Sequence, residues 1–322
     1  MRTILITIAE RLALAVLTLF IVSVLIFGSV ALLPGDFARA VLGQSATPET
    51  VAAFEKQIGL DKPASERYVD WLSSAVQGDF GNSFASRPGA ERRVVDIIGP
   101  RLRNTLVLAG LTAAIAIPLA ISLGIMAARW RNSWFDRMVN AGTLTTISVP
   151  EFFVAYILIL LFAVKFPVFR SLTTVRPNMG MVETLENLAL PVLTLTLVIV
   201  AHMMRMTRAA IIGVLGSSYV EMARLKGAPP LRIVLRHALP NALAPIASVV
   251  AFNLAYLIVG AVIIEVVFVY PGIGQALVDA VRTRDVPVVQ ACALLFALTY
   301  IFLNLIADLI AIGTNPRLLH PR

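Results

Sequence analysis

Charged residues are scarce in this sequence. They make up 14% of its 322 residues, whereas 58% are hydrophobic, and the mean hydropathy is +0.84. A soluble globular protein has about 25% charged residues, so this chain has too few charges to cover a water-exposed surface. Much of it must therefore lie in lipid.

Cysteine and histidine are also rare. The single cysteine, Cys292, lies in an apolar run, which excludes an internal disulfide and a cysteine-based metal site. The three histidines, His202, His237 and His320, are scattered and show no metal-ligand spacing. The sequence also lacks a Gly-x-x-x-x-Gly-Lys-Ser/Thr phosphate loop. We therefore expect no catalytic residue, metal or cofactor in this chain, and no ATP hydrolysis by it.

The net charge of +8 has two possible meanings. In a soluble domain a basic excess indicates nucleic-acid binding, but in a membrane chain it marks the cytoplasmic loops. We therefore expect membrane lipid around the chain and no nucleic-acid partner.

Six stretches of the sequence are candidates for membrane spans, since a helix needs about 20 apolar residues to cross the hydrocarbon. Four uncharged runs of that order are Leu12–Leu33, Asn104–Ala128, Asn241–Ile264 and Val286–Ala307. Two weaker ones are Met138–Val164, which Glu151 interrupts, and Leu188–Met204, which contains His202. The first run has 22 uncharged residues. That is more than the roughly 7–15 of a signal-peptide core, so we expect a retained helix.

The orientation follows from the basic residues of the short loops. With the N-terminus inside, the inner segments carry 13 basic residues and the short outer loops carry 5. The long segment 34–103 has 9 basic and 9 acidic residues, and loops of that length cross with little regard to charge. We therefore predict that both termini are cytoplasmic.

The segment 34–103 is predicted to form an external subdomain with helices of its own. Thr47, Pro48 and Glu49 are typical of a helix start, and Gly59 is a fitting stop. A second helix is predicted from Pro63 to about Gln77. The whole chain then divides into an N-terminal transmembrane helix (1–33), this subdomain (34–103), a core of five helices (104–313) with a loop at 219–240, and a cytoplasmic tail (314–322).

The loop at 219–240 is the most distinctive segment. Its sequence predicts a short helix stopped at Gly227, a corner at Pro229 and Pro230, and a second short basic helix ended by Pro240. Such an elbow on the cytoplasmic face is a compact knob that fits a groove of a soluble partner. A connector that serves topology alone is the alternative.

The spacing within this loop resembles the EAA loop of binding-protein-dependent ABC permeases. Glu221 and Ala223 match its first element, and Gly227 follows at the expected distance. Leu239 and Pro240 close the pattern, while Met222 and His237 depart from it. In that family the loop docks on the ATPase subunit and transmits its motion, which the resemblance implies for this chain as well.

Other segments are similar to the dipeptide/oligopeptide branch of these permeases, first-subunit type. They are Gly59–Pro63, Gly78–Ser83, Arg101–Leu106, Glu265–Gly274, Arg284–Pro287 and Asn315–Arg317. The resemblance covers essentially the whole chain. It implies an all-α polytopic membrane protein with the type I importer permease fold, an outer helical subdomain between the first two spans, and a place in a bacterial cytoplasmic (inner) membrane.

The resemblance also implies partners and a function. The partners are a second homologous permease, one or two ABC ATPase subunits that bind ATP and Mg²⁺, and a solute-binding protein. The chain would form half of an alternating-access pathway for peptides or a similar small solute. One alternative is an ion-coupled secondary transporter with Glu151 as its ion site, although the sequence shows no inverted repeat. A receptor or scaffold is another.

Two acidic residues lie at or near membrane depth, where a carboxylate is costly. Glu151 follows Pro150. It is either a pathway wall that senses an ammonium group or a solvated carboxylate at a helix break. Glu265 precedes a turn at Pro271, Gly272 and Gly274, and it either belongs to an outer gate or lies at the interface.

Uncharged polar residues within the spans have two interpretations as well. Asn253 and Tyr256 either line the pathway or form hydrogen bonds between helices. His202 is expected to pack against neighbouring helices.

Overall fold

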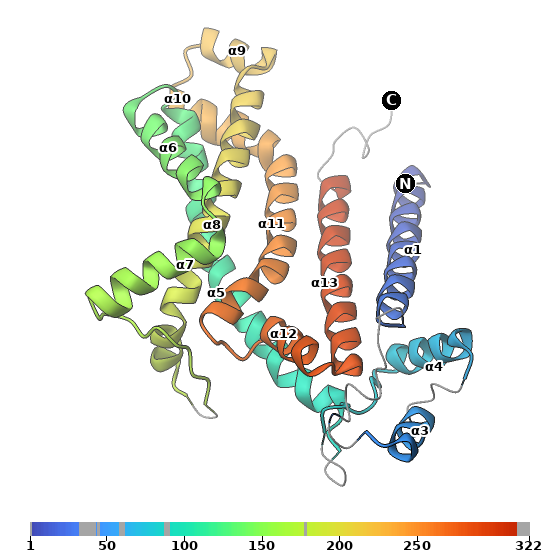
Figure 1. Ribbon diagram of the computed structural model, residues 1–322. Helices are drawn as coiled ribbons and strands as arrows, with labels where there is room; N and C mark the ends of the chain where they lie inside the picture. The colour runs from blue at the N-terminus through green and yellow to red at the C-terminus, as the bar shows by residue number, and fades with distance from the viewer. Residues whose placement is uncertain are drawn as a thin grey trace.

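The computed structural model describes residues 2–31, 46–57, 62–86, 91–176 and 179–313, together with Gly43. Helices dominate these ranges (Figure 1). Five are long and apolar enough to cross a membrane, and a bent helix pair makes a sixth span if it is counted as one. The five long helices are α1 (Arg2–Ala31), α5 (Val94–Arg129), α8 (Met181–Leu215), α11 (Leu239–Val267) and α13 (Val286–Gly313). The predicted all-α class with about six spans is confirmed.

The run Met138–Val164 is not one straight helix, which corrects the sequence prediction. It forms α6 (Trp134–Ser148) and α7 (Glu151–Ile159), which continues as a π-helical segment, Leu160–Lys165. The two parts are bent by 104°. Val149 is extended, with φ −107° and ψ 133°, because the ring of the following proline disfavours helical backbone at the residue before it.

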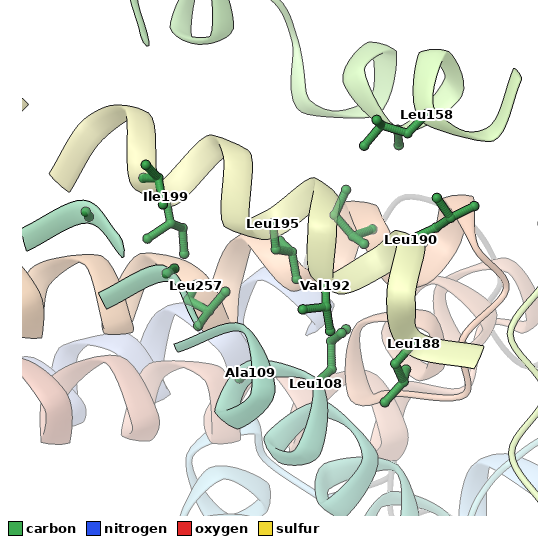
Figure 2. Close-up of a cluster of buried hydrophobic side chains, with 14 of the residues drawn as sticks. Leu108, Ala109, Leu158, Leu188, Leu190, Val192, Leu195, Ile199 and Leu257 are labelled. Atoms are coloured by element: carbon green, nitrogen blue, oxygen red, sulfur yellow. The ribbon is translucent and has the colours of Figure 1, made fainter. Parts of the chain in front are cut away.

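Helix α8 is the centre of the bundle. Its most apolar 18-residue window is 78% buried, whereas that of α1 is 6% buried. Leucine, valine and isoleucine side chains of α8 pack with Leu108 and Ala109 of α5 and with Leu257 of α11 (Figure 2). This helix gave one of the weaker hydropathy signals because its neighbours are other helices rather than lipid. Polar residues such as Thr194, which donates to the carbonyl of Leu190, are tolerated there.

Helix α5 begins at Val94 and is longer than the apolar run predicted. The run Asn104–Ala128 covers only its lipid-compatible part. The first turns carry Asp96, Arg101 and Arg103, so they extend beyond the hydrocarbon into the segment assigned to the outer subdomain.

Two outer helices follow α1. They are α3 (Pro48–Gln57) and α4 (Ala64–Val76). Thr47 caps α3 as predicted, because its side chain accepts from the amide of Thr50 at 3.2 Å. On α4, Tyr68 packs edge-on against Phe27 of α1, with ring centroids 5.5 Å apart. The predicted stop at Gly59 and the tail 314–322 lie outside the described residues.

The remaining helices are short and lie at opposite ends of the bundle (Figure 1). Helices α9 (Ser218–Leu225) and α10 (Pro230–Arg232) form a projection at the end where α1 begins and α13 finishes. Helix α12 (Ile273–Thr283) lies toward the other end, on the side of α3 and α4. The outer helices and the projection are thus on opposite sides, as the span count requires.

Candidate functional site

The first limb of the elbow, which we define as residues 219–240, has the predicted helix–glycine geometry. Helix α9 ends just before Gly227, which has a φ of +74°. The amide of Ala228 donates to the carbonyl of Ala223 at 3.1 Å, and the amide of Gly227 to that of Arg224 at 2.9 Å. This is the glycine-dependent closure of a helix C-terminus, in which the left-handed residue favours glycine.

The second limb differs from the prediction. Helix α10 passes into a π-helical segment, Ile233–Ala238, which runs into α11 without a break. Pro240 therefore does not end a helix. The amide of Leu239 donates to the carbonyl of Val234, five residues back. This wider turn accommodates a proline that has no N–H and would clash with the carbonyl four residues before it.

The two limbs contact each other and expose apolar side chains. Val220 of α9 is fully buried, and the hydroxyl of Tyr219 lies 3.5 Å from the carbonyl of His237. Glu221 is exposed, while Ala223, His237 and Leu239 are partly buried. Four large apolar side chains of the elbow face outward: Met222, Leu225, Leu231 and Leu235, with Leu225 77% exposed. Apolar groups on a fixed scaffold are typical of a protein-binding surface.

Glu265 forms the centre of a second cluster, at the opposite end. Its side chain is fully buried at the end of α11. The hydroxyl of Thr105 donates to Oε1 at 2.6 Å, and the amides of Gly274 and Gln275 donate to Oε2 at 2.7 and 3.2 Å. The carboxylate thereby holds the first turn of α12, where orphan amides and the helix dipole favour negative charge.

The turn between α11 and α12 packs closely against this carboxylate. A Cβ atom at Gly272 would lie 2.1 Å from Oε1 of Glu265, and one at Gly274 would lie 2.5 Å from Cα of Val262. Asn104 donates to the carbonyl of Pro271 at 2.8 Å. The structure thus brings together Glu265, Pro271, Gly272 and Gly274, which the sequence had placed in one candidate gate.

Tyr270 and α5 complete the cluster. The Tyr270 hydroxyl donates to the carbonyl of Asn104 at 2.8 Å. Burial, with a further contribution from the charge of Glu265, raises the pKa of this phenol. Tyr270 therefore remains a donor at physiological pH.

The other end of α12 is held by the outer segment. The hydroxyl of Ser83 donates to the carboxylate of Asp285, and the amide of Phe84 donates to the same group at 3.0 Å. Asp285 is 4% exposed and follows Arg284, which has a left-handed φ of 56°. Both ends of α12 are therefore fixed by buried carboxylates, Glu265 and Asp285.

A third group of polar residues lies between α7, α8 and α11. The hydroxyl of Tyr256 donates to the carboxylate of Glu151, the first residue of α7. The second carboxylate oxygen of Glu151 is buried and has no hydrogen-bond partner in the described part of the chain. The His202 ring of α8 lies 6.4 Å from that of Tyr256 on α11, so it contacts a neighbouring helix as expected, although its side chain stays exposed. The helix does break at Glu151, but its carboxylate is paired rather than simply solvated.

Asn253 stands apart from this group. It is buried, and its amide donates to the carbonyl of Val249 in its own helix at 2.8 Å. In the described structure this bond is made within its own helix, and a role of Asn253 in lining the pathway stays a prediction.

Sequence reasoning assigned no role to three polar residues that the structure shows to be central. They are Thr105, which bonds Glu265, and the pair Asp136–Arg208. Arg208 of α8 makes a bidentate ion pair with Asp136 of α6, with both N–O distances 2.7 Å. Thr105 lies in a segment that carried the family resemblance, which was a usable signal. Nothing in the sequence links positions 136 and 208.

Comparison with known proteins shows that two family models match this chain. Residues 120–320 match the family "Binding-protein-dependent transport system inner membrane component". Residues 4–109 match the N-terminal family "Binding-prot-dependent transport system membrane comp, N-term".

Curated relatives match over most of their length. The glutathione transport system permease protein GsiC of Escherichia coli (strain K12) is 39% identical over 299 residues, which is 93% of this chain and 94% of the relative. GsiC of Shigella dysenteriae serotype 1 (strain Sd197) gives the same figures. GsiC of Shigella boydii serotype 4 (strain Sb227) is 38% identical over the same shares. With its bundle of spanning helices, this chain therefore belongs to the family of inner membrane components of binding-protein-dependent transport systems.

Proposed function

We propose that the chain forms half of the solute pathway of an ATP-driven importer and docks on its ATPase subunits through the elbow. The observation that carries this proposal is the set of exposed apolar side chains on the elbow, Met222, Leu225, Leu231 and Leu235. Met222 and Leu225 are exposed and precede the apolar helix that begins at Pro230, and a loop that served topology alone would have no reason to expose them. A groove on a soluble subunit would bury them.

The solute proposed is a small peptide, with glutathione as the first candidate. Support comes from the relatives, which are named as glutathione transport permeases. Glutathione and short peptides share a free ammonium group. The Glu151 carboxylate, with one oxygen bonded to Tyr256 and the other unpaired in the described structure, suits such a group.

The pathway is proposed to be shared with a second homologous permease. Glu151 and Tyr256 lie beside a row of exposed aromatic residues on α7: Phe152, Phe153 and Tyr156. A solute-binding protein would deliver the solute at the end that carries α3 and α4, where α12 serves as the gate helix. In this scheme the elbow transmits ATPase motion to α8 and α11, which it joins.

Family membership favours this scheme over the ion-coupled alternative. The transport assay separates the two directly. The assembled complex in proteoliposomes should import glutathione or a dipeptide only with ATP inside. Uptake driven by a proton or sodium gradient without ATP would contradict the proposal.

The coupling role is tested at Gly227. A Cβ there would meet no atom within 4 Å, so the effect of Gly227→Val comes from the left-handed φ of +74° alone. That strain costs about 1–3 kcal/mol or shifts the turn. We expect the variant to insert normally. We expect solute-stimulated ATP hydrolysis by the complex to fall by about fivefold or more, which is the factor that corresponds to the lower end of this strain, about 1 kcal/mol.

Two variants control this test. Gly227→Asn should keep most activity, because asparagine tolerates left-handed backbone. Gly213→Val adds the same side chain to α8 at a position where a Cβ also meets no atom within 4 Å and φ is not positive, and it should be near wild type. Wild-type stimulation of ATP hydrolysis in Gly227→Val would show that the elbow is only a topological connector.

A further inference from the structure

A cavity of about 500 Å³ lies behind the elbow. Its walls come from the ends of α5 and α8 and from the elbow itself. The cavity is of the size that small-molecule sites have. Its position is set by Arg129, the last residue of α5, and Leu215, the last residue of α8. Both helices are membrane spans, so the cavity lies where they leave the hydrocarbon.

The charged residues that line this cavity are all positive. Arg129, Arg131 and Arg224 line it, and none of its lining residues in the described chain is acidic. The ion pairs formed among described residues do not include these three arginines. Both carboxylate oxygens of the nearby Asp136 are occupied by Arg208. Three guanidinium groups around one partly enclosed space repel each other, so an anion between them would be stabilised.

The rest of the lining is apolar, with Ile212, Leu215 and Ile233 among its members. A ligand that suits both parts has a compact anionic group joined to an apolar body. Arginine forks match the oxygens of phosphate. Basic pockets between spanning helices on the cytoplasmic side are suited to phospholipid headgroups.

We propose that this cavity binds the phosphate of an anionic phospholipid headgroup from the adjacent leaflet, held by Arg129, Arg131 and Arg224. Arg224 belongs to the elbow, Arg129 is the last residue of α5, and Arg131 lies in the turn that follows α5. A bound headgroup therefore ties the elbow to the bundle. The effect of that tie on transport rests on the proposed coupling role of the elbow, whereas the binding itself does not.

The binding test uses the full chain purified in a neutral detergent, without partner subunits, and phosphatidylglycerol as the ligand. Native mass spectrometry of a lipid titration gives the dissociation constant. Loss of two arginine contacts in the double variant Arg129→Gln/Arg131→Gln should weaken binding about tenfold or more. Arg224→Gln, at an exposed position on the elbow, should weaken it by a smaller factor and provides a second variant that leaves the bundle intact.

The matched control is Arg137→Gln/Arg205→Gln, which removes the same charge from exposed positions outside the cavity. It should bind phosphatidylglycerol as the wild type does. Equal loss in both double variants would show general surface attraction and overturn the proposal. Wild-type affinity in Arg129→Gln/Arg131→Gln would overturn it as well.

Two further arms identify the source of the phosphate. Phosphatidylcholine should not compete, whereas competition by inorganic phosphate at low millimolar concentration would assign the cavity to a free phosphate ligand and overturn the lipid assignment. The last arm adds the ATPase subunits. Release of bound phosphatidylglycerol on their addition would assign the arginines to that protein interface and overturn the proposal for the assembled transporter.

Discussion

Replacing Gly272 with alanine would place a methyl group where the carboxylate of Glu265 lies. The added Cβ would be 2.1 Å from Oε1, 2.2 Å from Cδ and 2.4 Å from Oε2. The backbone conformation at this position suits alanine, because the φ of Gly272 is −100°. The three closest contacts of the added methyl group therefore all belong to one buried side chain.

The expected cost follows from what that side chain must give up. To make room, the carboxylate moves away from Thr105, Gly274 and Gln275, its three donors. A hydrogen bond to a charged group contributes about 1.5–3 kcal/mol. If two of the three bonds are lost, the free energy of unfolding falls by about 3–6 kcal/mol. The N-terminus of α12 loses its anchor at the same time.

A double-mutant cycle isolates this contact. The free energy of unfolding is measured by titrating the chain with SDS in mixed micelles, for the wild type, Gly272→Ala, Glu265→Ala and the double variant. In the Glu265→Ala background the three clashing atoms are absent, so Gly272→Ala should cost less than about 1 kcal/mol. The coupling energy between the two positions is the difference between these two costs and should be at least about 2 kcal/mol.

The control is Gly110→Ala in α5, where a Cβ would meet no atom within 4 Å. It should leave stability unchanged or raise it by up to about 1 kcal/mol. Equal losses for Gly272→Ala in both backgrounds would refute the reasoning, because the cost would then not arise from Glu265.

Three further predictions concern other parts of the chain. Arg208→Ala leaves the carboxylate of Asp136, which is 3% exposed, without its bidentate partner, so it should lower the free energy of unfolding by about 2–4 kcal/mol in the same SDS titration. The control Arg205→Ala, at an exposed position one turn earlier in α8, should cost under about 0.5 kcal/mol. Similar losses in the two variants would contradict the role of the ion pair. Asp285→Ala removes the carboxylate that accepts from Ser83 and Phe84, so it should loosen that part of the outer segment and speed its cleavage by an added protease; unchanged cleavage would place the restraint elsewhere. A topology reporter after Arg131 should read cytoplasmic and one near Gln57 external, as the 13-to-5 distribution of basic residues predicts; the reverse pattern would invert the orientation.

The apolar runs predicted the spanning segments well because membrane insertion depends on local composition. They did not predict how each span is used. Helix α8 has the lowest hydropathy of the five long described helices and is the most buried of them, while the strongly apolar α1 lies at the edge of the bundle. Hydropathy measures compatibility with lipid, and a helix at the centre of a bundle contacts little of it.

The effect of prolines on the helices was predicted only in part from the sequence. Pro150 produces a sharp bend that the sequence only hinted at, whereas Pro240 is absorbed by a π-helical segment and ends nothing. A proline removes one hydrogen bond in either case. Whether the helix breaks or widens depends on what packs around it, which the sequence does not contain.

The sequence by itself determined that this chain spans a membrane with about six helices, that it carries a cytoplasmic-type elbow with a glycine stop, and that it resembles importer permeases. Each of these depends on residues that are close together in the chain. Only the tertiary structure decided why the motif glycines are there. Gly227 is needed for its backbone and has open space around it, while Gly272 has an ordinary backbone and no space at all. The contacts that create this difference join Thr105 to Glu265 across 160 positions and Ser83 to Asp285 across 202, and separations of that length are fixed by packing rather than by local sequence.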